Sequence, residues 1–322
     1  MKNVLLLGNG IDRAYDKHAV SWTDLLDKMT TIKNLPKHEN LPFPLEVVLR
    51  TNDHVDEELK KHNKELYGSV EDAELRDVLE TVLRMGFDEI LTTNYDFALE
   101  GTAIYPKDLT DYQIKKSIKN KNEDKKAESK YLLHTYQKAE FDGVPNRIWH
   151  IHGDARRPGS IVIGHYMYVN LVSKWRAEFE KQEKIYRNWD EKQIDAPSTC
   201  WLDSFVLGNV YILGLGMKFC ELDLWWLLNR KKREDAAHGK VIFYEPEIPA
   251  DAAKYALLRA YDVEVRHLGF KLMPSVENEA CDDDLQAERD EQDRKTREFN
   301  AKTFEDFYGD ALMDIEKEMK KG

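Results

Sequence analysis

The sequence contains little cysteine, and the cysteines that it has are widely spaced. Only three of its 322 residues are cysteines, at Cys200, Cys220 and Cys281. No paired Cys-x-x-Cys motif can be formed from them, which excludes a structural zinc ribbon. We expect all three to be buried or incidental thiols in a reducing compartment.

Long hydrophobic runs are missing as well. No stretch approaches the roughly 18 consecutive apolar residues that a membrane span requires. The run Val4–Leu7 is followed at once by Gly8 and Asn9, so it is too short for the core of a signal peptide. We interpret it as a buried strand and expect a cytoplasmic protein without membrane contact.

Positive charge is in deficit, with 48 Lys and Arg against 60 Asp and Glu and a formal net charge of −12. This balance argues against broad electrostatic attraction to nucleic acid, and we expect no direct nucleic-acid binding. The hydrophobic content of 42% is that of an ordinary globular protein. The length allows one large α/β domain with insertions or two modest domains.

What the chain does have is a regular alternation of short apolar runs and helical patterns. The runs predict buried strands at Val4–Leu7, Glu89–Thr92, Arg147–Ile151, Val210–Leu213, Val241–Tyr244 and Val263–Arg266. The helical patterns fall at Trp22–Thr31, Ala73–Met85, Tyr166–Asn188, Glu221–Lys232 and Ala250–Tyr261. This alternation predicts an α/β fold with a Rossmann-like, doubly wound parallel sheet, helical insertions and a C-terminal helix.

Two insertions and a charged tail interrupt or extend this pattern. About eighty residues separate the first two strands, too many for one crossover helix, so an insertion is expected near residues 37–69. The charge-rich residues 107–130 form a second. We therefore expect one α/β domain over residues 1–268 and a charged helical extension over residues 269–322, which docks on its own domain or on a neighbouring subunit. The apolar positions of its docking face are Phe299, Phe304, Phe307, Tyr308, Leu312 and Ile315.

The first motif is the turn Gly8–Asp12, set directly behind the first strand. Gly8 permits a sharp turn, and Gly10 lets the backbone approach a phosphate without a side chain in the way. Arg13 stands where the dehydrogenase fingerprint has its third glycine, so the turn is not that fingerprint. It is interpreted as a dinucleotide phosphate cradle, with an ordinary tight turn as the alternative.

The second motif is Thr92–Asp96, at the carboxyl end of the second strand, where open α/β sheets place their ligands. Asn94 offers both a donor and an acceptor, and Asp96 an acceptor. The alternative is structural: Asp96 caps a helix over Phe97–Thr102 and Asn94 closes a turn.

The third motif is Trp149–Asp154, in which His150 and His152 share one face of a strand that ends at Gly153. His152 stands at the carboxyl edge and is a candidate general base or ribose ligand. His150 lies deeper and is interpreted as structural. No third ligand is placed for a metal, and no metal is expected.

The fourth motif, Leu213–Met217, again sets glycines behind a strand. Gly214 and Gly216 offer a second backbone approach to a dinucleotide. Trp225 and Trp226, in the helix that follows, are interpreted as core residues.

The order GNGID, TTNYD, HG and then GLG resembles the sirtuin-like domains, and most closely the bacterial anti-phage members that hydrolyse NAD. The resemblance spans Met1 to about Leu268. It implies that Asn94, near the nicotinamide ribose, and His152 are catalytic. It also implies contacts to NAD from the other motif residues, namely Gly8, Asn9, Gly10, Asp12, Thr93, Asp96, Gly153, Gly214 and Gly216.

The sequence departs from the deacetylating sirtuins in two ways. It cannot build their four-cysteine zinc module, and it has Thr93-Asn94 where they usually have Gln-Asn. The resemblance therefore favours water as the acceptor, with NAD as the substrate and no separate cofactor. The implied activity is an NAD glycohydrolase that releases nicotinamide and ADP-ribose in abortive infection.

Other interpretations stay open. The segment GNGID followed by Ser21–Leu25 also resembles the AbiH-type abortive-infection proteins. A sensor that binds NAD or ADP-ribose without turnover, and a lysine deacylase, are further alternatives. From the resemblance we expect control by a trigger, by homo-oligomerisation or by a partner defence protein such as a helicase or nuclease.

Overall fold

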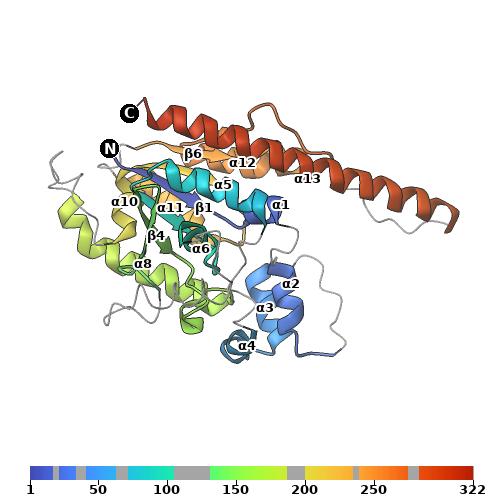
Figure 1. Ribbon diagram of the computed structural model, residues 1–322. Helices are drawn as coiled ribbons and strands as arrows, with labels where there is room; N and C mark the ends of the chain where they lie inside the picture. The colour runs from blue at the N-terminus through green and yellow to red at the C-terminus, as the bar shows by residue number, and fades with distance from the viewer. Residues whose placement is uncertain are drawn as a thin grey trace.

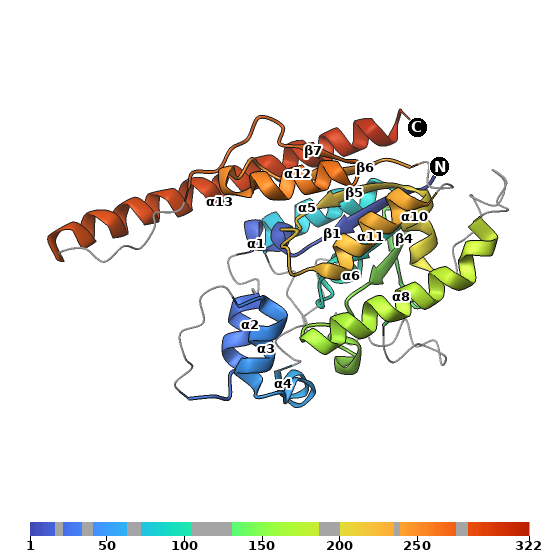
Figure 2. The ribbon, with the colours of Figure 1, turned by 180° about the vertical axis from the view of Figure 1, so that it is seen from behind.

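The computed structural model describes residues 1–16, 22–33, 41–62, 72–104, 131–186, 200–234, 239–274 and 283–321. These residues form a central sheet with helices on both faces (Figures 1 and 2). One face carries α1 (Gly10–Tyr15), α5 (Ala73–Arg84), α6 (Ala98–Ile104) and the C-terminal α13 (Asp283–Met319). The other carries α10 (Trp201–Leu207), α11 (Leu222–Arg233) and α12 (Ala252–Ala260).

The sheet has seven strands in the order β3-β4-β2-β1-β5-β6-β7. Six of them pair in parallel: β1 (Asn3–Leu7), β2 (Glu89–Thr92), β4 (Val144–His150), β5 (Asn209–Leu213), β6 (Val241–Tyr244) and β7 (Val263–Arg266). This is the strand order of the doubly wound dinucleotide-binding fold. The predicted fold class is confirmed. The chain winds outward in both directions from β1 and β5, so the ligand crevice of such a sheet lies at their carboxyl ends.

The antiparallel edge strand β3 (Gln137–Phe141) was not predicted from the sequence. It joins β4 through Asp142 and Gly143, whose φ angles are +50° and +80°. A two-residue Asp-Gly turn with both φ angles positive is a frequent β-hairpin connection. The apolar signal of the strand is weak because Lys138 and Glu140 alternate with its buried positions.

The insertion between the first two strands is helical. Within residues 41–62 it forms α3 (Phe43–Thr51) and α4 (Val55–His62), which pack with α2 (Trp22–Met29) beside the sheet (Figure 1). The long helix α8 (His165–Tyr186) contacts α3. The short 3-10 turns Pro158–Ser160 and Pro249–Asp251 complete the described elements. The second insertion, expected at residues 107–130, lies outside the described residues.

Helix α13 packs on its own chain by the face that its sequence predicts. Phe307, Tyr308, Ala311, Leu312 and Ile315 are buried, whereas Phe299 is 45% exposed and lies off that face. Polar contacts fix the same helix. The Tyr15 hydroxyl donates to the Glu305 carbonyl at 2.6 Å, and Arg266 pairs with Asp314 at 2.5 Å. No helix within the described residues combines the length and the hydropathy of a membrane span.

The turns after β1 and β5 pack back to back at the centre of the sheet. The Gly8 N–H donates to the Leu213 carbonyl at 2.9 Å, and the Gly10 N–H donates to the Gly214 carbonyl at 2.8 Å. A Cβ on Gly8 would lie 2.5 Å from the Gly214 oxygen, and one on Gly214, whose φ is +70°, would lie 2.7 Å from the Gly8 oxygen. These glycines are therefore required by the contact between the two turns.

We predict that Gly214→Ala lowers the free energy of unfolding by about 2 kcal/mol, because the alanine is strained at positive φ and meets the Gly8 carbonyl. Equilibrium denaturation measures the change. Gly309→Ala is the matched control. A methyl group added at Gly309, within α13, would meet no atom within 4 Å, so this change should stabilise the protein by about 1 kcal/mol. Equal effects of the two substitutions would contradict this account of the turns.

Candidate functional site

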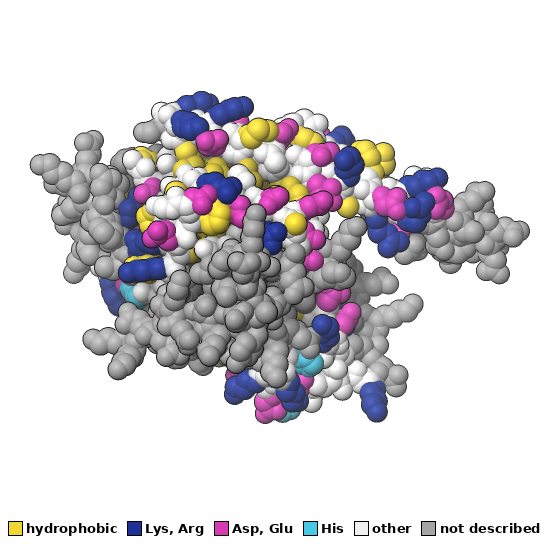
Figure 3. Space-filling model, viewed as in Figure 1, with side chains coloured by type: hydrophobic (Ala, Val, Ile, Leu, Met, Phe, Trp, Pro, Cys, Tyr) yellow, Lys and Arg dark blue, Asp and Glu magenta, His cyan; other side chains and the backbone are white. Residues whose placement is uncertain are grey.

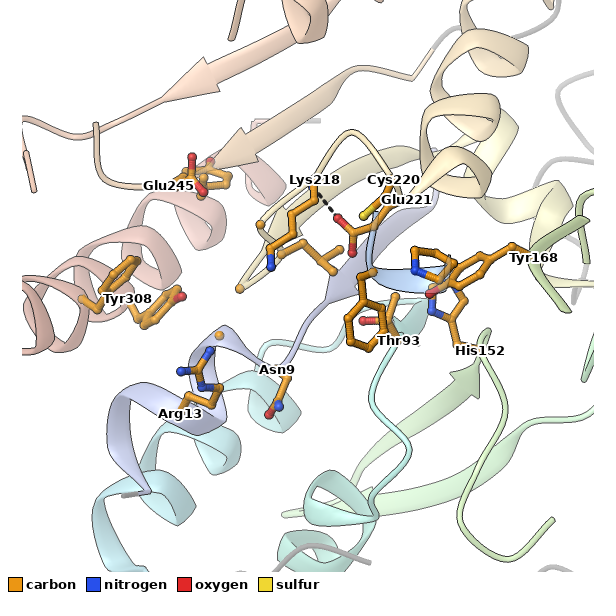
Figure 4. A pocket seen from close by; sticks show the side chains of 18 residues that line it. Asn9, Arg13, Thr93, His152, Tyr168, Lys218, Cys220, Glu221, Glu245 and Tyr308 are labelled. Atoms are coloured by element: carbon orange, nitrogen blue, oxygen red, sulfur yellow. Dashed lines mark hydrogen bonds between the residues drawn. The ribbon is translucent and has the colours of Figure 1, made fainter. Parts of the chain in front are cut away.

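A cavity of about 240 Å³ lies at the carboxyl ends of the parallel strands (Figure 4). Asn9 and Gly10 line it from the turn after β1, and Gly214 and Gly216 from the turn after β5. Thr93 reaches it from the end of β2. The cavity therefore occupies the place at which the strand order predicts a ligand crevice.

His152 forms the wall of the cavity beyond β4. Its side chain is 2% exposed, and Nε2 lies 2.6 Å from Oδ2 of Asp223, which is fully buried. The carboxylate accepts a hydrogen bond from Nε2–H and so leaves the lone pair of a neutral imidazole on Nδ1. Nδ1 has no hydrogen-bond partner among the described residues. The pair thus presents an oriented base with one unused nitrogen.

Aromatic and acidic side chains surround this end of the cavity. The Tyr168 ring meets His152 edge to face at a centroid distance of 5.7 Å. Phe43, from the helical insertion, and Glu221, which directly precedes α11, also line it. Burial, followed by the charge of Asp223, raises the pKa of Glu221 to about 7. The carboxylate accepts the Lys218 backbone N–H through Oε2 at 2.5 Å.

Two cations lie between the ends of the cavity. Figure 4 shows Arg13 extending from α1 on one side and Lys218 from the loop after β5 on the other. Both side chains are exposed. They supply positive charge beside the glycine turns, which favours an anionic ligand.

The far end of the cavity is built by Glu245, which follows β6, and by Tyr308 and Phe304 of α13. Glu245 pairs with the buried Lys254 at 2.7 Å and accepts the Tyr255 hydroxyl at 2.9 Å. Burial raises the pKa of Glu245 despite this pairing. The C-terminal helix is therefore part of the cavity wall.

Asn94 lies in a second, much smaller cavity beside the first. Its Nδ2 donates to Oδ2 of Asp12 at 2.6 Å, and its Oδ1 is buried without a partner among the described residues. Its backbone carbonyl accepts from Nδ1 of His150 at 2.8 Å, and Nε2 of His150 lies 2.9 Å from Glu100. Asn94 thus links the turn after β1 to the strand end of β4.

The pKa values of the buried carboxyl groups around Asn94 are raised. Burial, then the neighbouring Asp96 and Asp16, raise the pKa of Asp12 well above its usual range. Burial raises the pKa of Asp96 to about 6. Burial alone would lower the pKa of His150, but the Glu100 carboxylate raises it above the usual value. Both ring nitrogens of His150 contact acceptors inside this cluster, which supports the structural role that the sequence suggested for the deeper histidine.

The site residues predicted from the sequence lie in two different cavities, and two of them lie in neither. Those that line the large cavity are Asn9, Gly10, Thr93, His152, Gly214 and Gly216. Asp12, Asn94 and Asp96 line the smaller one, and the Asp96 carboxylate also caps α6 by accepting the Ala98 N–H at 2.9 Å. Gly8 and Gly153 line neither, because Gly8 packs on Gly214 and Gly153, at φ +89°, packs on Ser160.

Sequence reasoning did not assign several other residues that build the site, among them Tyr168, Glu221, Asp223, Glu245 and Tyr308. Glu245 directly follows a predicted strand, so the rule that located the other strand ends would have found it. Tyr168 and Tyr308 lie inside helices and carry no local signal. The Gly10 N–H is bonded to the Gly214 carbonyl and is therefore not available to a ligand in the cavity.

Comparison with known proteins connects this geometry to a family. No curated protein matches the chain. The family model of the SIR2-like domain matches residues 88–265, more than half of the sequence. The matched region runs from the start of β2 into β7 and includes the Asn94 and His152 motifs. Proteins with this domain are often NAD-dependent enzymes, and the chain belongs to the SIR2-like domain family.

Proposed function

We propose that this SIR2-like protein hydrolyses NAD to nicotinamide and ADP-ribose. The observation that carries the proposal is the His152–Asp223 pair, which presents an unpartnered Nδ1 at the wall of a cavity on the switch point of the sheet. Family membership supports a role in NAD chemistry. The pair adds a nitrogen atom that can accept a proton from a ligand in the cavity.

The cavity suggests how NAD lies in it. Its pyrophosphate fits between Arg13 and Lys218, over the turns at Gly10 and Gly214. The nicotinamide ribose then faces His152, and the adenosine extends toward Glu245 and α13. This orientation places the scissile glycosidic bond at the end of the cavity that contains the acid–base groups.

Hydrolysis of the glycosidic bond of NAD does not require a general acid. Nicotinamide leaves from a cationic pyridinium, so the glycosidic bond breaks without protonation of the leaving group. The remaining task is to stabilise an oxocarbenium-like ribose and to orient its hydroxyls. Nδ1 of His152 accepts a proton or a hydrogen bond from a ribose hydroxyl, and the Asp223 carboxylate stabilises the imidazolium that results.

The role that we propose for Asn94 depends on its amide oxygen, which has no hydrogen-bond partner among the described residues. Nδ2 is committed to Asp12, whereas Oδ1 is an acceptor without a partner among the described residues. A water molecule held there would lie at the strand ends next to Thr93, which lines the large cavity. We assign Asn94 the positioning of water or of a ribose hydroxyl.

We further propose that the activity serves abortive infection. Continuous loss of NAD is toxic, so the enzyme requires control by a trigger, by self-association or by a partner defence protein. The test is the NAD content of cells that express the chain. Wild type should deplete NAD on activation, and unchanged NAD after exposure to phage would contradict this role.

We predict that His152→Ala lowers the rate of NAD hydrolysis by about 100-fold or more, because it removes the oriented base. Asp223→Asn should lower the rate ~10-fold or more, because an amide does not stabilise the imidazolium. Chromatography of nicotinamide and ADP-ribose measures both rates. His54→Ala, an exposed histidine between α3 and α4, is the control and should match wild type. Full activity of His152→Ala would refute the assignment.

We predict that Asn94→Ala stops most NAD hydrolysis while ADP-ribose still binds, because Asn94 lies outside the large cavity. Calorimetry with ADP-ribose measures binding without turnover. A sensor without enzymatic activity predicts the opposite pattern: wild type would bind ADP-ribose and never consume NAD, with or without a trigger.

A further inference from the structure

We propose that Glu221 is the general base of the reaction and takes the proton from the water that attacks the ribose, while His152 serves a ribose hydroxyl. The inference rests on the proposed hydrolysis of NAD and adds a catalytic residue to it. Glu221 directly precedes α11, two residues before Asp223, so one short segment supplies both carboxylates of the site.

Glu221 lies where a base for the attacking water is needed. Its side chain lines the cavity at the end that also contains His152 and Tyr168 (Figure 4). One oxygen, Oε2, is fixed by the Lys218 backbone N–H at 2.5 Å. The other oxygen has no partner among the described residues and is available to a ligand in the cavity. The carboxylate is thus oriented by one hydrogen bond and keeps an acceptor free.

The other acids near the cavity are committed elsewhere. Asp223 is fully buried behind His152 and bonded to it. Glu245 lies at the opposite end and forms an ion pair with Lys254. Asp12 accepts the Asn94 amide in the smaller cavity. Glu221 is therefore the carboxylate, among the described residues, that faces the predicted position of the nicotinamide ribose without a cationic partner.

The surroundings of Glu221 suit a base. Its burial and the charge of Asp223 raise its pKa to about 7, whereas the Lys218 N–H and the charges of His152 and Lys218 oppose the shift. Tyr168 and Cys220 also face this end, and burial raises the pKa of each, so both stay neutral near pH 7. A carboxylate in this range binds a proton more strongly than an exposed one and still ionises near neutral pH.

The step balances without a further reactant. The water oxygen forms a bond to the anomeric carbon, and the glycosidic bond breaks with its electron pair passing to the pyridinium nitrogen, which becomes neutral nicotinamide. The proton of the attacking water passes to the Glu221 carboxylate and then to solvent. The net products are nicotinamide, ADP-ribose and one proton.

The first experiment compares Glu221→Gln with wild type across pH. The amide oxygen can still accept the Lys218 N–H, so the loop keeps its anchor, but the side chain can no longer take a proton. We expect kcat to fall about 100-fold, with ADP-ribose binding retained. Because the ionised form is needed, the wild-type rate should rise with pH through about 7, and this limb should vanish in the variant. Glu247→Gln, outside the cavity, is the control.

The second experiment supplies a nucleophile that needs no base. Sodium azide should restore NAD loss in Glu221→Ala and yield ADP-ribosyl azide, because azide attacks the anomeric carbon without losing a proton. Azide should not rescue His152→Ala. Wild type that consumes NAD beside an equally active Glu221→Gln would overturn this inference alone. Wild type that consumes none would overturn the proposed hydrolysis, and the inference with it.

Discussion

Two backbone hydrogen bonds, from Gly8 to the Leu213 carbonyl and from Gly10 to the Gly214 carbonyl, join the loops that follow the two central strands. Such a contact is possible only where Gly8, Gly10 and Gly214 carry no side chains. It fixes the floor of the cavity at the point where the winding of the sheet reverses. The His152 wall, the two cations and the helix α13 are all placed relative to this floor.

Much of the fold could be predicted because parallel strands buried on both faces appear as continuous apolar runs. Glu89–Thr92 and Val241–Tyr244, which are buried at every position, begin and end where the sequence placed them. The edge strand Val263–Arg266 also has the predicted bounds, although its Glu264 is exposed. Strand β3 was not predicted, because it is solvated on one side and polar residues alternate along it, which weakens its apolar signal. Helix α10 was not predicted from the sequence, because its seven residues are all buried and show no amphipathic period.

The site was predictable to the extent that it consists of strand ends. Thr93, His152 and the glycines each follow a strand that the sequence identified, and the topology brings them together. The separation of Asn94 from the large cavity could not be predicted, because it depends on the backbone conformation after β2, which the motif alone does not specify. Tyr308 is distant from every motif along the chain, and only tertiary packing connects it to them.

Helix α13 extends from the cavity wall to a part of the molecule far from the cavity. Its 37 residues make a rod about 55 Å long, and its first turns project beyond the sheet in Figure 1. Figure 3 shows Lys, Arg, Asp and Glu side chains mixed along the part of this rod that extends past the sheet. Tyr308, in the same rod, forms part of the cavity wall. One continuous helix therefore joins the projecting end to the cavity wall. A molecule bound to the projecting end would therefore contact the same helix that forms part of the cavity wall.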